Sequence, residues 1–353
     1  EEAAQGVQKA IAAMGFPCRI EDINSLDAFM GSLPGHGVEN VRRCLMNTRH
    51  VADLIPTGAL WIGSEMAPCE YYPDLSPALM QCITTGNTPF FLNLHVRDLG
   101  HTFVVGPTGS GKSVCLATII SQALRYKGMT AYVFDKGMST YTMCKSMRKR
   151  HYNIGGEDYV DDAGNRHAQY AFSPLQYLES RQDAAWLCTW LEMMVELNGV
   201  TLTPEKRNEI AARMEVLRTS GKRTLLNFVN GLQDREMKDA LQVYTRRGMM
   251  GYMLDADEDG LDLDAGGGLV IFEIEDLLAM EDPRYVLPVL LYMFCRIERS
   301  LKGQPAIVAI DEAWKALEHP VFRNRHMEWF VVWGKSNSHH VLATHSLSPS
   351  FTA

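Results

Sequence analysis

The sequence predicts an α/β protein: a mostly parallel sheet with flanking helices, interrupted by an all-helical insertion. Three observations carry this prediction. A strand pattern at 102–105 leads through a glycine-rich loop into a helix at 113–126 and a second apolar strand at 130–134. Residues 176–250 show helical spacing of apolar residues throughout. From residue 266 to residue 344, strand and helix patterns alternate again.

Composition places the chain among ordinary globular proteins. Its 353 residues, 46% hydrophobic and 22% charged, are enough for two globular units. No run of 18 or more apolar residues is present, so no membrane-spanning helix is expected. The 8 cysteines lack zinc-type spacing, and we expect them to be reduced in a cytosolic core. A net charge of −8 argues against non-specific coating of nucleic acid.

The order of the predicted elements divides the chain into four segments. Residues 1–88 are expected to be a partial N-terminal and linking region of helices, short strands and turns. Residues 89–175 form the first half of the sheet domain, 176–250 a helical subdomain, and 251–353 the second half of the sheet domain, truncated at its C-terminus. Because the sequence begins with Glu1 and ends soon after its last predicted strand, we expect a piece of a longer protein.

Local signals place the later elements. In the helical subdomain, Thr203 is a candidate cap and Pro204 a first-turn residue for a helix at 205–218, which follows a helix at 184–197. The elements expected in the second half of the sheet domain are strands at 269–274, 306–310 and 341–344 and helices at 285–301, 312–317 and 324–333.

The strongest motif is the segment at 106–113, GPTGSGKS, which matches the spacing G-x-x-x-x-G-K-[ST] of phosphate-binding loops. Glycines let successive backbone N–H groups point at phosphate oxygens, and the following helix directs its positive end to the same place. Lys112 is expected to reach the β- and γ-phosphates of ATP and to act in catalysis, while the Ser113 hydroxyl binds Mg²⁺. An incidental glycine-rich turn is the alternative, but the strand before the loop and the helix after it favour the site. The predicted ATP contacts are Gly106, Pro107, Thr108, Gly109, Ser110, Gly111, Lys112, Ser113 and Val114.

An acidic pair follows the apolar strand at 306–310. Asp311 is expected to support the Mg²⁺ ion, commonly through water, and Glu312 to polarise the attacking water as a general base. Adjacent acids after a strand can also be a solvated helix start, because carboxylates suit a first helical turn. The phosphate-binding loop upstream favours the catalytic interpretation.

Polar residues at two other strand ends are weaker candidates. Thr344 and His345 end the last predicted strand, where a side chain could touch the γ-phosphate or the lytic water; an ordinary polar strand end is the alternative. Asp135 could bridge to the nucleotide site or to a neighbouring subunit, or it could simply end a strand and start a turn. The basic clusters at 148–150 and 246–247 could contact nucleic acid or supply an arginine finger, or be solvated helix surface.

Together these residues resemble the large ATPases of type IV secretion and conjugative transfer systems, most closely the TrbE group, within the HerA/FtsK-like P-loop NTPases. The resemblance runs from about residue 33 to residue 348. Its carrying segments are 31–35, 88–90, 93–95, 100–102, 106–113, 133–137, 172–175 and 311–314.

The resemblance implies a RecA-like P-loop NTPase core with a helical subdomain, and hydrolysis of ATP to ADP and phosphate with Mg²⁺ as cofactor. It implies a self-assembled oligomer, expected to be a hexamer, peripheral at the cytoplasmic face of the bacterial inner membrane. Other type IV secretion components are the implied partners, and DNA is a further one.

This sequence departs from the family pattern at two positions. Gly334 stands where the family has Arg before Lys335, and His345 replaces a glutamine. Both positions belong to the expected γ-phosphate sensor, so they bear on hydrolysis more than on binding. The leading hypothesis is a motor ATPase of conjugative secretion, with His345 as a weak sensor candidate. The alternatives are a HerA/FtsK-like DNA translocase and a nucleotide-binding assembly scaffold with little turnover.

Overall fold

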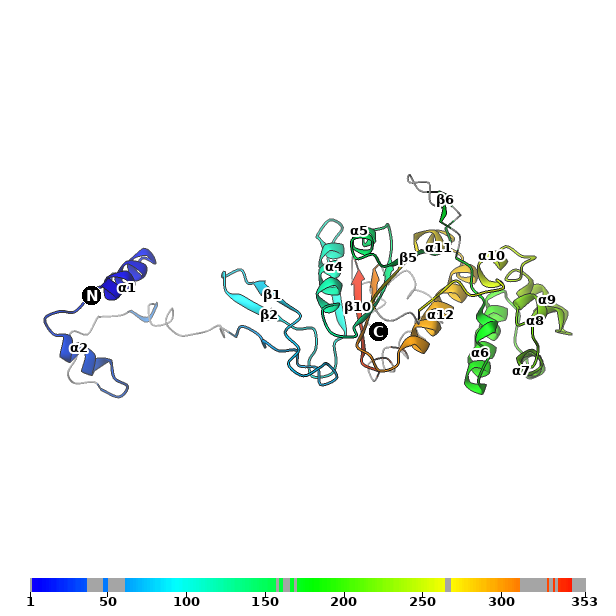
Figure 1. The fold of residues 1–353 in the computed structure, drawn as a ribbon, viewed down its shortest axis with the longest axis horizontal. Helices are drawn as coiled ribbons and strands as arrows, with labels where there is room; N and C mark the ends of the chain where they lie inside the picture. Colours follow the sequence, from blue (N-terminus) through cyan, green and yellow to red (C-terminus); the bar gives the residue numbers. More distant parts are fainter. Residues whose placement is uncertain are drawn as a thin grey trace. The chain divides into compact units, whose positions relative to one another are not determined.

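The computed structural model of the chain (Figure 1) divides into two compact units, Glu1–Trp61 and Ile62–Ala353. In the first unit, the helices α1 (Glu2–Ala13) and α2 (Ser25–Ser32) bury no residue. The residues that the structure describes are 2–36, 47–49, 61–156, 159–160, 166–167, 170–263, 268–311, 329, 333 and 336–344. Within these residues, no helix combines the length and the apolarity needed to cross a lipid bilayer.

A six-stranded sheet organises the second unit, in the order β3-β10-β9-β4-β8-β5, with every neighbouring pair parallel. Three of its inner strands, β4, β9 and β10, are buried at every position, as expected for parallel strands covered on both faces. The predicted mostly parallel sheet is therefore confirmed. The strand bounds are β3 Thr102–Val105, β4 Thr130–Asp135, β5 Arg150–Asn153, β8 Gly268–Glu273, β9 Ala306–Asp311 and β10 Ser338–Thr344.

Alternation along the strands supplies two hydrophobic clusters, one on each face. On one face, Val133 of β4 belongs to the same cluster as Leu116 and Ile120 of α4 (Lys112–Ala123). On the other face, Phe134 stacks on Phe294 of α12 (Pro283–Ser300), with ring centroids 4.7 Å apart. The sheet is thus sandwiched between α4 and α12.

Smaller elements complete the second unit. Strands β1 (Met80–Ile83) and β2 (Pro89–Leu92) form an antiparallel hairpin ahead of the sheet in sequence. A second antiparallel pair is formed by β6 (Tyr159–Val160) and β7 (Arg166–His167). Two short helices, α5 (Tyr141–Ser146) and α11 (Glu275–Ala279), follow β4 and β8 respectively.

The predicted helical segment is observed, and Figure 1 shows its helices grouped next to α12, on which α6 packs. Thr203 caps α7 as predicted, accepting a hydrogen bond from the N–H of Lys206, and Pro204 opens the helix. Ser180 and Asp183 form a capping box at the start of α6. The elements are η1 Pro174–Tyr177, α6 Arg181–Leu197, α7 Pro204–Arg218, α8 Leu225–Asn230, α9 Arg235–Gln242 and α10 Gly251–Leu254.

Helix α12 continues through Pro288, which has no N–H to give to the carbonyl one turn earlier. That carbonyl, of Arg284, instead accepts a hydrogen bond of 2.9 Å from the Tyr244 hydroxyl. Trp190 of α6 donates to the Pro288 carbonyl over 3.0 Å. The helical segment therefore supplies the donors that let a proline sit inside α12.

The last strand is longer than predicted. We expected it at 341–344, whereas β10 begins at Ser338 and includes His339 and His340, which are both buried. Three polar residues in a row hid the start of the strand from a search for apolar patterns. The helices predicted at 312–317 and 324–333 lie outside the described residues, apart from Trp329 and Trp333.

Candidate functional site

The glycine-rich loop and Asp311 lie at the same edge of the sheet. Strand β10 pairs with β3 on one side and with β9 on the other, so that Thr344 is opposite Val105 and Ala343 is opposite Asp311. Two strand spacings, about 10 Å, therefore separate the loop from Asp311. This is the carboxyl edge, where parallel sheets of α/β proteins bind their ligands.

Two glycines give the loop its shape. Gly109 (φ +79°) and Gly111 (φ +88°) occupy the left-handed region, and Gly111 caps the N-terminus of α4. A side chain would strain either position by about 1–2 kcal/mol. Gly106 is required for another reason: a Cβ there would lie 2.6 Å from the Ser110 hydroxyl oxygen. The Gly106 N–H donates to the Thr344 carbonyl over 3.2 Å, which fixes the loop to β10.

Lys112 turns back into this loop. Its side chain is only 9% exposed, and its ammonium group donates to the Pro107 carbonyl over 3.0 Å. Ser113 is half-buried on the first turn of α4, while the next residue, Val114, is 71% exposed. A cation is thus held inside a glycine-rich curve at the start of a 12-residue helix, an arrangement suited to an anion.

The structure places the remaining predicted loop contacts on the open side of the curve. Thr108, Gly109 and Ser110 are exposed, and the Ser110 N–H donates to the Pro107 carbonyl over 3.2 Å. A ligand can therefore approach this side of the loop without displacing the sheet.

Only some of the predicted catalytic residues fall within the described residues. Asp311 ends β9 and is 7% exposed, and Thr344 ends β10 with the same exposure. The carboxylate and the glycine-rich loop come together at one edge, as the sequence predicted. Glu312, His345, Gly334 and Lys335 lie outside the described residues.

Asp135 is buried and bonded within its own chain. Its carboxylate accepts hydrogen bonds from the Ser139 hydroxyl (2.5 Å), the Thr140 N–H (2.7 Å) and the Thr140 hydroxyl (2.7 Å). Of the two sequence interpretations, the described contacts match the strand end that starts a turn. They also tie the turn to the start of α5, which Thr140 precedes.

Sequence reasoning missed Glu273, the last residue of β8. It is 2% exposed, and its carboxylate accepts hydrogen bonds from the N–H groups of Gly137 (3.2 Å), Met138 (2.6 Å) and Glu275 (2.9 Å). Burial raises the pKa of Glu273 despite these hydrogen bonds, and the charge of Asp135 adds to the increase. The available signal was an apolar strand ending in an acid, the pattern that also marks Asp135 and Asp311.

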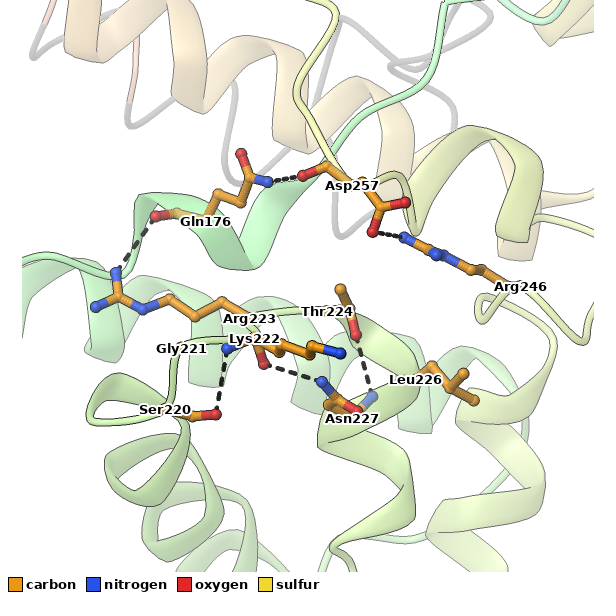
Figure 2. Close-up of a pocket in the computed structure, with 10 residues that line it drawn as sticks. All are labelled: Gln176, Ser220, Gly221, Lys222, Arg223, Thr224, Leu226, Asn227, Arg246 and Asp257. Carbon is orange, nitrogen blue, oxygen red and sulfur yellow. Dashed lines mark hydrogen bonds and ion pairs between the residues drawn. The ribbon is translucent and has the colours of Figure 1, made fainter.

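A separate polar cavity of about 670 Å³ lies among the helices (Figure 2). Its two arginines are engaged by their own chain: Arg223 donates to the Leu178 carbonyl over 2.9 Å, and Arg246 donates to the Asp255 carbonyl over 2.7 Å and pairs with Asp257. Arg246 therefore has a structural role that the sequence interpretation did not include. The cavity is lined by Gln176, Ser220, Gly221, Lys222, Arg223, Thr224, Leu226, Asn227, Arg246 and Asp257.

Comparison with known proteins follows the same lines. Residues 78–185 match the family model "Type IV secretory system Conjugative DNA transfer". The chain is 47% identical over 348 residues to a "Probable conjugal transfer protein TrbE" of Sinorhizobium fredii, covering 99% of this chain and 51% of the relative. It is also 47% identical to "Conjugal transfer protein TrbE" of Rhizobium radiobacter, covering 99% of this chain and 42% of that protein.

A solved structure extends the comparison to the fold. The structure of VirB4 of Thermoanaerobacter pseudethanolicus aligns with a TM-score of 0.57 at 13% identity, covering 78% of this chain and 80% of that one. At that identity the likeness concerns the fold alone, and it confirms the predicted RecA-like P-loop NTPase core. The chain spans about half the length of the curated relatives it matches. By sequence and by fold, it belongs to the TrbE and VirB4 family of conjugal transfer and type IV secretion proteins.

Proposed function

We propose that the chain is the ATP-hydrolysing portion of a motor subunit in a conjugative type IV secretion system. The observation that carries this proposal is the placement of the glycine-rich loop and Asp311 at one carboxyl edge, with a single strand between them. A nucleotide whose phosphates occupy the loop extends its γ-phosphate toward Asp311.

Each residue has a role in this proposal. The backbone N–H groups of the loop and the Lys112 ammonium group bind the phosphates. The Ser113 hydroxyl and the Asp311 carboxylate are oxygen donors of the kind that Mg²⁺ prefers, and they would hold this ion. When bound, Mg²⁺ supplies charge neutralisation at the β- and γ-phosphates. Glu312 accepts the proton of the attacking water, and His345 contacts the γ-phosphate.

The wider role rests on the relatives. Their printed names associate them with conjugal transfer and type IV secretion. We propose that the motor energises pilus assembly and the transfer of DNA or protein, as an oligomer at the cytoplasmic face of the inner membrane with other secretion components. A HerA/FtsK-like translocase would use the same ATP chemistry, and stimulation of turnover by duplex DNA would favour it.

The test is Mg²⁺-dependent ATP hydrolysis by the purified chain, by Lys112→Ala and by Asp311→Asn. We expect turnover to vanish with Lys112→Ala. With Asp311→Asn we expect a fall of about tenfold or more, with ATP binding retained. ATP binding without turnover in the unmodified chain would contradict the motor. It would favour the assembly scaffold suggested by Gly334 and His345.

A further inference from the structure

Three carboxylates end three adjacent strands at the carboxyl edge. Phe134 of β4 is paired with Ile310 of β9, so the next residues, Asp135 and Asp311, end neighbouring strands at the same level. On the other side, Asp135 is paired directly with Glu273 of β8. Adjacent strands lie about 5 Å apart, so Asp311, Asp135 and Glu273 form a row.

The row also faces one side of the sheet. Side chains two residues apart on a strand point the same way. Two residues before Asp311, Asp135 and Glu273, the side chains of Ala309, Val133 and Ile271 all belong to the hydrophobic cluster built on α4. The three carboxylates therefore project toward the face covered by α4, the helix that the glycine-rich loop opens.

Two members of the row are buried more deeply than a turn requires. Asp135 is 0% exposed and Glu273 is 2% exposed, and the hydrogen-bond donors described for both are hydroxyl and N–H groups. Burying carboxylates beside a third carboxylate is unfavourable unless each is fully hydrogen-bonded. The described hydrogen bonds all come from the backbone at 137–140 and 275 and from the hydroxyls of Ser139 and Thr140.

The consequence is a rigid turn next to Asp311. The segment 136–140 leaves β4 on the side of Asp311 that is opposite the glycine-rich loop, because β4 and β10 flank β9. The two buried carboxylates fix this turn from below. A catalytic carboxylate needs such support, because small displacements of a reacting group cost large factors in rate.

We propose that Asp135 is a positioning residue for ATP hydrolysis: it fixes the 136–140 turn beside Asp311, with Glu273 as the second anchor. This inference rests on the proposed ATPase function and assigns it a residue outside the two motifs. Asp135 acts through the turn and through its charge one strand from Asp311, which strengthens the attraction of the site for a divalent cation. It does not contact the phosphates.

The helical segment offers a matched control. Asp255 is 2% exposed, and its carboxylate accepts hydrogen bonds from the N–H groups of Leu225 (2.7 Å), Leu226 (3.2 Å) and Arg246 (3.0 Å). Like Asp135 it is a buried carboxylate that holds a turn, but it belongs to the helical segment. Asp255→Asn therefore measures what the loss of such a carboxylate does to folding alone.

The experiment compares Asp135→Asn, Ser139→Ala and Asp255→Asn with the unmodified chain. For each we measure kcat, KM for ATP at saturating Mg²⁺, the Mg²⁺ concentration for half-maximal turnover, and the melting temperature. For Asp135→Asn we expect kcat to fall about tenfold and the Mg²⁺ requirement to rise about threefold, while KM changes less than about twofold. Ser139→Ala, a milder change, should shift both quantities in the same direction. Asp255→Asn should lower the melting temperature and leave kcat and the Mg²⁺ requirement within about twofold.

Two results would overturn the inference. If Asp135→Asn and Ser139→Ala keep the kcat and Mg²⁺ requirement of the unmodified chain, Asp135 has no positioning role, and the ATPase proposal stands without it. If all three variants lose kcat in proportion to their melting temperatures, the role is structural only. Absence of turnover in the unmodified chain would instead remove the ATPase proposal, and this inference with it.

Discussion

Two loops of this chain carry nearly the same letters in different surroundings. At 109–113 the sequence is GSGKS, and at 220–224 it is SGKRT. The first joins β3 to the 12-residue helix α4, its Gly111 has φ +88°, and its Lys112 is buried. The second joins two helices, α7 and α8, and Lys222 is exposed.

The backbone explains the difference. Gly221 stays outside the left-handed region that Gly111 occupies. The first N–H groups of α8, from Leu225 and Leu226, are already bonded to the Asp255 carboxylate. A Gly-Lys pair before a hydroxyl residue therefore makes a phosphate site only where the strand, the curve and an uncapped helix start accompany it.

The largest expected difference is between the two lysines. Lys112→Ala should lower ATP affinity about 100-fold or more, equivalent to about 2.7 kcal/mol, because a charged donor to the phosphates is lost. Lys222→Ala removes the same side chain from the second loop and should change the affinity less than about twofold. Titration calorimetry with Mg²⁺-ATP measures both. Equal losses in the two variants would mean that the second loop also binds the nucleotide.

Acid should destabilise the sheet domain, which contains buried histidines, whereas residues 176–250 contain none. The rings of His95 and His339 lie 4.6 Å apart, between centroids. Burial lowers the pKa of His95 to about 4, with a contribution from His101, and burial also lowers the pKa of His339 well below its usual value. Both are therefore neutral in the folded chain at physiological pH.

The sign follows from the pKa in each state. The unfolded chain takes up a proton at about pH 6.5, and the folded chain does so at His95 only near pH 4. The stability is complete above pH 6.5 and falls as the pH drops toward 4. At pH 5 we expect a loss of about 2 kcal/mol from His95, measured by urea unfolding against about pH 7.5. His95→Gln should flatten this dependence. An unchanged free energy of unfolding at about pH 5 would show that the histidines titrate normally.

The glycines of the two loops should differ by a smaller amount. Gly111→Ala forces a Cβ into the left-handed region, so we expect a loss of about 1–2 kcal/mol in stability and weaker ATP binding. Gly221→Ala meets open space and no positive φ, so it should be neutral or slightly stabilising. Thermal unfolding and ATP titration of the pair test this. A neutral Gly111→Ala would argue against the observed curve of the loop.

The smallest expected effect concerns the junction between the helical segment and α12. Tyr244→Phe leaves the Arg284 carbonyl without the donor that replaces the N–H missing at Pro288, so we expect a loss of about 1 kcal/mol. In a Pro288→Ala background the restored N–H should reduce this loss. A double-mutant cycle by urea unfolding gives the coupling, and a coupling of zero would refute this account of the proline.

Much of this architecture could be predicted from the sequence, because apolar strands, the glycine-rich loop and the caps are local signals. The strand 102–105 and the cap at Thr203 match the structure residue for residue. What escaped prediction depends on contacts that are distant in sequence. Nothing local shows that Glu273 bonds the turn after β4, or that His339 belongs to a strand buried between β3 and β9.

The most direct test of the nucleotide site is amide hydrogen exchange of the chain with and without Mg²⁺-ATP. We predict slower exchange at 106–115, where the loop N–H groups would bind phosphate, and unchanged exchange at 220–227, where the second Gly-Lys pair lies. Protection at 220–227, or bound ATP without protection at 106–115, would contradict the assignment of the nucleotide to the loop between β3 and α4.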